Sequence, residues 1–204
     1  MSSDRDDSGR DDEQDDDEEF NSRSFDQNRK EAASVCAPQI RSLLSDWYEV
    51  PEEYIINVES VKDGEYDAGI NDIVDRLDYR GVDWLVPKDG ELIPVGERLR
   101  KGERGEWRDM TLRTQNGTGN PSEGQTIPDA IEGHGIYPRD YVLAVREQWE
   151  VHRAVLLDTA TVIERAQSPA VQTGYASNDD GSAYRWFRLA DLLMQDCHQE
   201  VWCG

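Results

Sequence analysis

The sequence lacks any apolar run that approaches the ~20 residues of a membrane-spanning helix. Its first residues have neither the basic nor the apolar region of a signal peptide. Only three cysteines are present, an odd number without framework spacing, which is not the pattern of a small disulfide-stabilised secreted domain. A Gly-rich phosphate loop and a His-Glu-x-x-His motif are also missing. These absences predict a soluble, cytoplasmic protein with no membrane contact and with free thiols.

Lysine is scarce as well, since only 4 of the 22 basic residues are lysine. Acidic residues number 44, so the formal net charge is −22, a balance that repels nucleic acid at low salt. Acidity combined with little lysine resembles the composition of proteins from halophilic archaea or their viruses. Molar salt reduces the screening length to about 3 Å, and in such a solvent acidity says little about partners.

The first 20 residues contain eleven acids and two arginines, for a net charge of −9. A segment this polar cannot bury enough apolar surface to fold alone. We therefore predict a disordered acidic tail over residues 1–24 and a single domain over residues 25–204. The remaining 184 residues still carry −13, which indicates that the acidity is a property of the whole chain.

Apolar spacing predicts a mixed order of helices and strands after the tail. The expected elements are a helix from Asp26 that Pro38 either ends or restarts, a strand or further helix at 54–58, a helix over 70–77, a strand at 107–113, a loop over 114–128, strands at 141–145 and 154–157, a helix over 159–166, a loop over 167–182, a strand at 184–188 and a helix over 189–194. This pattern predicts an α/β (α+β) fold with a single mixed sheet flanked by helices.

A β-hairpin is expected between residues 81 and 100, because two runs rich in β-branched and aromatic residues flank a segment with Pro, Asp and Gly. Alternation along its second strand places Glu97 on the face of Ile93, Val95 and Leu99. Asp83 interrupts the apolar pattern of the first strand in the same way. A carboxylate in such a position needs an ion-pair partner, a proton or a bound cation. Salt bridges to nearby arginines are one alternative, and a divalent metal held against a phosphate is the other.

Asp83 and Glu97, with thirteen residues between them and Arg98 and Arg100 following, resemble the motif of the PD-(D/E)xK nuclease superfamily, the restriction-endonuclease-like fold. The resemblance covers about residues 72–113. It implies that Asp83 and Glu97 hold Mg²⁺ or Mn²⁺ and that Arg98 or Arg100 stabilises the charge developing on a DNA phosphate. In that family a lysine two residues after the acid orients the attacking water. Here the position two after Glu97 is Leu99, whereas a shift by one places Arg98 there and leaves Gly96 where the acid should be.

The most basic window of the chain follows the hairpin, with six basic and three acidic residues between 98 and 113. We predict that it contributes the nucleic-acid-binding residues Lys101, Arg104, Arg108 and Arg113. Arginine forks match phosphate oxygens in pairs. The alternative is that these arginines only neutralise surrounding acids. Farther on, the run from Tyr184 to Arg188 is either an amphipathic strand that closes the sheet or a set of arginines and aromatic rings that stack on bases.

Two functions follow from these patterns. The first is a metal-dependent nuclease acting on DNA, or a catalytically degenerate nuclease-fold protein that binds nucleic acid. The second is a non-catalytic α/β module that binds a protein partner, in which the same acids pair with arginines; Leu99 in the lysine position favours this second function.

Overall fold

The computed structural model describes residues 25–62, 68–102, 109–115, 122–133, 135–177, 181–194 and 198–203. The chain divides into two units, residues 1–35 and residues 36–204. Within its described part the first unit contains only the start of helix α2, and the account below concerns the second. The predicted tail lies outside the described residues. No helix in the described ranges is both long and apolar enough to cross a membrane.

Helix α2 (Phe25–Tyr48) runs through Pro38 without ending, so the predicted break or restart at this proline is wrong. Proline removes one backbone hydrogen bond from a helix interior. Ile40, Leu43 and Leu44 bury their side chains in a cluster with the main sheet, and we infer that this burial offsets the lost bond.

Residues 54–58, which the sequence left open between strand and helix, divide between the two. A 3₁₀ turn (Glu52–Tyr54) leads into the two-residue strand β1 (Ile56–Asn57), and helix α3 (Val58–Lys62) begins directly after it. Helix α4 (Ala68–Tyr79) then confirms the helix predicted over 70–77. These helices share a small apolar cluster formed by Val58, Val74 and Val82.

The predicted hairpin is confirmed as β2 (Trp84–Lys88) and β3 (Glu91–Lys101). Its turn consists of Asp89 and Gly90, which both have positive φ angles, 53° and 83°. Two consecutive positive φ angles are those of a type I′ turn, whose twist matches that of paired strands. The two-residue turn pairs Lys88 with Glu91 and, farther along, Trp84 with Val95.

In the described part of the chain the main sheet has six strands, in the order β1-β2-β3-β5-β6-β9. Among these strands only β3 and β5 pair in parallel and the other pairs are antiparallel, so the sheet is mixed as predicted. The remaining strands of this sheet are β5 (Asp140–Glu147), β6 (Glu150–Asp158) and β9 (His198–Cys203). The crossover from β3 to β5 passes through strand β4 (Asp109–Gln115) and helix α5 (Glu123–Gly133).

A second sheet corrects the expectation of a single one. Strands β4 (Asp109–Gln115), β8 (Ala183–Arg188) and β7 (Thr173–Ser177) form it, in the order β4-β8-β7, and all its pairs are antiparallel. Strand β7 lies inside the predicted loop over 167–182. Helix α5 (Glu123–Gly133) likewise begins inside the predicted loop over 114–128. Helices α6 (Thr159–Arg165) and α7 (Leu189–Leu193) lie close to where they were predicted.

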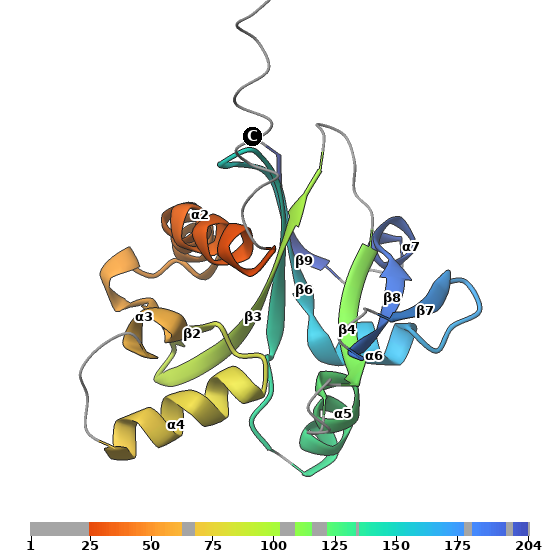
Figure 1. Cartoon of the computed structure of the whole chain (residues 1–204), viewed down its shortest axis with the longest axis horizontal. Helices are drawn as coiled ribbons and strands as arrows, with labels where there is room; N and C mark the ends of the chain where they lie inside the picture. The colour runs from red at the N-terminus through yellow and green to blue at the C-terminus, as the bar shows by residue number, and fades with distance from the viewer. Residues whose placement is uncertain are drawn as a thin grey trace, which may run out of the picture. The chain divides into compact units, whose positions relative to one another are not determined.

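Both faces of the main sheet are covered (Figure 1). Helix α2 packs on one face, where the Trp84 ring is fully buried. The three-stranded sheet with α5, α6 and α7 covers the other, through a cluster that includes Tyr141, Phe187 and Leu189. The chain is therefore an α/β protein with helices on a mixed sheet. The two faces of β3 consequently meet different surroundings, and this difference decides how the predicted site is built.

Candidate functional site

The side chains of Asp83 and Glu97 lie on opposite faces of the main sheet. Glu97 shares the α2 face, because its Oε2 accepts a hydrogen bond from Trp84 Nε1 at 2.8 Å. Asp83 immediately precedes Trp84, and alternation directs it to the other face. The two residues still touch, since the Asp83 Oδ2 accepts a hydrogen bond from the Glu97 backbone N–H at 2.5 Å. The resemblance implied that the two carboxylates would converge on one metal ion, and they do not.

Arg98 shares the face of Asp83, and its guanidinium contacts an acid, a backbone carbonyl and an aromatic ring. Its Nη2 forms an ion pair with Glu123 Oε1 at 2.5 Å, and the two side chains are only 19% and 12% exposed. Its Nη1 donates to the Glu97 carbonyl oxygen at 2.6 Å, and its guanidinium carbon lies 4.9 Å from the centre of the Tyr141 ring. Burial opposes the charge of Arg98, but Glu123, Tyr141 and Asp83 outweigh it and raise the pKa of this guanidinium.

Two glycines make room for this arrangement. A β-carbon on Gly96 would lie 2.2 Å from Cε1 of Tyr141, so the aromatic ring occupies the space that a side chain at position 96 would fill. A β-carbon on Gly81, whose φ is +74°, would lie 2.7 Å from Glu123 Oε1. Of the two registers left open by the sequence, the structure therefore places Gly96 and Arg98, rather than Glu97 and Leu99, on the face of Asp83.

Burial dominates the titration of the acids. It raises the pKa of Asp83 to about 8, against the opposing effect of Arg98. Burial also raises the pKa of Glu97, although the Trp84 hydrogen bond and Arg98 lower it in part. Burial raises the pKa of the Tyr141 phenol too, with Glu123 acting in the same direction. A buried acid of this kind is stabilised when it carries a proton or when a cation lies nearby.

The remaining predicted residues lie along β3 and β4. Arg100 donates through Nη2 to the Thr111 hydroxyl, and burial lowers the pKa of its guanidinium. Lys101 ends β3, and Arg113 is exposed on β4. Arg104 and Arg108 lie outside the described residues. Within the described ranges no group of three or more His, Cys, Asp or Glu side chains is arranged for a metal ion.

The sequence reasoning missed Glu123 and Tyr141. Glu123 is the first residue of α5 and also accepts a hydrogen bond from the Arg113 backbone N–H at 3.2 Å. A local signal for that helix exists, because Gln125 Oε1 accepts a hydrogen bond from the Ser122 backbone N–H at 2.9 Å, as in a capping box. Tyr141 begins the buried run of β5, and nothing in the sequence distinguishes it from an ordinary core aromatic.

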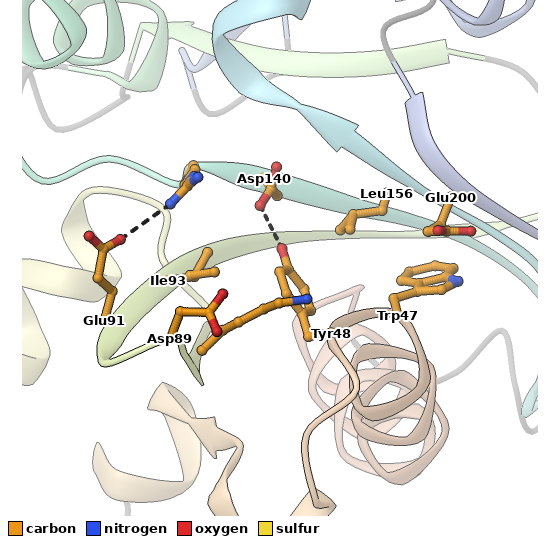
Figure 2. A pocket seen from close by; sticks show the side chains of 10 residues that line it. Trp47, Tyr48, Asp89, Glu91, Ile93, Asp140, Leu156 and Glu200 are labelled. Carbon is orange, nitrogen blue, oxygen red and sulfur yellow. Dashed lines mark hydrogen bonds and ion pairs between the residues drawn. The ribbon is translucent and has the colours of Figure 1, made fainter.

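A separate depression of about 380 Å³ opens on the α2 face (Figure 2). There the Tyr48 hydroxyl donates to Asp140 Oδ2 at 2.5 Å, and burial together with Asp140 raises the pKa of the tyrosine. Trp47 lies beside it, and Asp89 and Glu91 approach from the hairpin turn. None of the predicted site residues that the structure describes lines this depression.

Comparison of the chain with protein-family models, with curated proteins and with solved structures gives no match.

Proposed function

We propose that this chain is a nucleic-acid-binding protein of restriction-endonuclease-like fold that has lost the ability to cleave. The observation that carries the proposal is the divergence of the Asp83 and Glu97 carboxylates to opposite faces of the sheet. A hairpin of β2 and β3 within the main sheet supports the resemblance, with one acid before its first strand and one within its second.

The loss of cleavage follows from the residues around Asp83. A two-carboxylate metal site needs both oxygens on one ion at about 2.1 Å, which opposite faces do not allow. Arg98 takes the place of the family's lysine on the Asp83 face. A guanidinium whose pKa is raised cannot accept a proton from water, so it supplies charge but no base. The binding of Mg²⁺ or Mn²⁺ remains a prediction. On the Asp83 face, the acid that pairs with Arg98 is Glu123 of α5.

The nucleic-acid part of the proposal rests on the cations beyond this cluster. Arg100, Lys101 and Arg113 follow it along β3 and β4, in a protein whose net charge is otherwise strongly negative. A local basic segment in an acidic chain restricts the surface that a polyanion can approach.

The test combines binding and cleavage. Duplex DNA is incubated with the full chain and Mn²⁺ or Mg²⁺, at the lowest salt at which circular dichroism shows the folded state. We expect binding that weakens as salt rises and no cleaved product. Lys101→Glu weakens binding, whereas Lys88→Glu, at the far end of the hairpin, serves as the matched control and leaves it nearly unchanged.

Two results would overturn this function. Cleavage that Glu97→Ala abolishes would establish the metal-dependent nuclease instead, because Glu97 is otherwise only a buried partner of Trp84. Failure of the native chain to bind any nucleic acid would favour the protein-interaction module.

A further inference from the structure

The three-stranded sheet has one buried face and one face outside the apolar clusters. Met110, Leu112 and Phe187 point into the cluster against the main sheet and are at most 2% exposed. Strand pairing aligns Thr111 with Trp186 and Arg113 with Tyr184, and alternation places these four on the opposite face. We call this opposite face the aromatic face; its residues are Asp109, Thr111 and Arg113 of β4, Tyr184, Trp186 and Arg188 of β8, and Gly174 and Ala176 of β7.

Two aromatic rings lie two residues apart on the aromatic face, about 7 Å along the strand. Trp186 and Tyr184 are both partly exposed, and neither belongs to an apolar cluster of the described residues. The Trp186 indole lies directly over the backbone of Gly174, where an added β-carbon would be 2.6 Å from its Cζ2. The glycine therefore allows the ring to lie against the sheet, which fixes its orientation.

Cations surround these rings. Arg113 and Arg188 are exposed on the aromatic face itself. Arg100 reaches the same strand from β3 and hydrogen-bonds the Thr111 hydroxyl, next to Trp186. Tyr184 and Asp109 both lie near enough to Arg100 to raise its pKa against the dominant effect of burial. Asp109 lies directly opposite Arg188 on this face, and Arg100 adds a cation from β3, on a protein with a net charge of −22.

We propose that the aromatic face binds single-stranded nucleic acid, with Trp186 and Tyr184 stacking on bases and the arginines contacting phosphates. This inference rests on the proposed function and names its substrate class. Charge complementarity selects a polyanion, and partly exposed rings beside arginines favour one with unpaired bases, since duplex DNA keeps its bases stacked on each other. Phe187, the sequence neighbour of Trp186, lies on the buried face and is therefore not available for stacking.

Fluorescence anisotropy of a labelled oligothymidylate, with the full chain in the same salt, tests the inference. Trp186→Ala should weaken binding by about five- to hundredfold, the loss of one base–aromatic stack. Tyr175→Ala is the matched control, because this tyrosine lies on β7 with its side chain 71% exposed, on the other face of the same sheet. It should leave the affinity within about twofold of the native value. Arg113→Ser replaces an exposed residue and keeps the test open if Trp186→Ala does not fold; it should also weaken binding.

The outcomes separate this inference from the function on which it rests. Duplex binding without oligothymidylate binding, or equal losses from Trp186→Ala and Tyr175→Ala, would overturn the aromatic face and leave the proposed function standing. Competition by heparin with no effect of Trp186→Ala would show a purely ionic surface and also overturn the stacking. Binding of neither nucleic acid would overturn both proposals.

Discussion

Replacing Asp83 by asparagine should make the stability of this protein less dependent on pH. The carboxyl has an ordinary pKa of 3.8 and a folded-state pKa of about 8, and burial is the main cause of the difference. Between these two values the folded chain keeps a proton on Asp83 that the unfolded chain releases. The free energy of unfolding therefore falls as pH rises, by about 1.4 kcal/mol per pH unit, and levels off above pH 8.

Asparagine is a suitable replacement because it is nearly isosteric and cannot ionise. Its amide oxygen still accepts the hydrogen bond from the Glu97 backbone N–H. The Asp83→Asn chain lacks the descending slope, so its stability relative to the native chain should improve by about 3 kcal/mol between pH 5 and pH 7. Glu97, whose pKa burial also raises, is present in both proteins and largely cancels from the comparison.

Urea unfolding followed by tryptophan fluorescence measures this difference, in molar KCl at five pH values from 5 to 9. Asp75→Asn, at an exposed position of α4, controls for the loss of one negative charge. Parallel pH profiles of the native and Asp83→Asn chains would refute the reasoning, because they would mean that Arg98 keeps Asp83 ionised in the fold.

Three further predictions concern the same cluster and the charge of the chain. Arg98→Met or Glu123→Leu alone should lower the free energy of unfolding in urea by about 3 kcal/mol, because each leaves a mostly buried charge without its partner. The double variant should recover most of this loss, and additive losses would contradict the ion pair. Gly96→Ala should destabilise the chain by about 2 kcal/mol through its clash with Tyr141, and an unchanged urea midpoint would mean that the ring moves freely. Thermal unfolding should shift to lower temperature from molar KCl to about 0.1 M, because the acids repel one another when unscreened, and an identical melt would exclude the halophilic interpretation.

Local chemistry was enough to predict much of the fold. Apolar spacing located α4, β5, β6, α6, β8 and α7, because the periods of 3.6 and 2 residues are properties of the element alone. The Asp89-Gly90 turn selects a two-residue hairpin, and strict counting from it pairs Trp84 with Val95. This register already separates Asp83 from the face of Glu97.

The tertiary structure decided what surrounds those residues. No periodicity in β3 indicates that a glutamate at the start of α5 pairs with Arg98, or that Tyr141 of the parallel strand fills the space beside Gly96. The continuous course of α2 through Pro38 and the separation of β4, β7 and β8 into a second sheet likewise depend on burial against distant residues. Sequence determined most of the regular elements and which side chains alternate along them, because those are short-range constraints, whereas β7 and the start of α5 were missed. The pairing of Arg98 with Glu123 was decided only by the packing of the crossover through β4 and α5 on the sheet. These two residues lie 25 positions apart, and no local pattern encodes the packing that joins them.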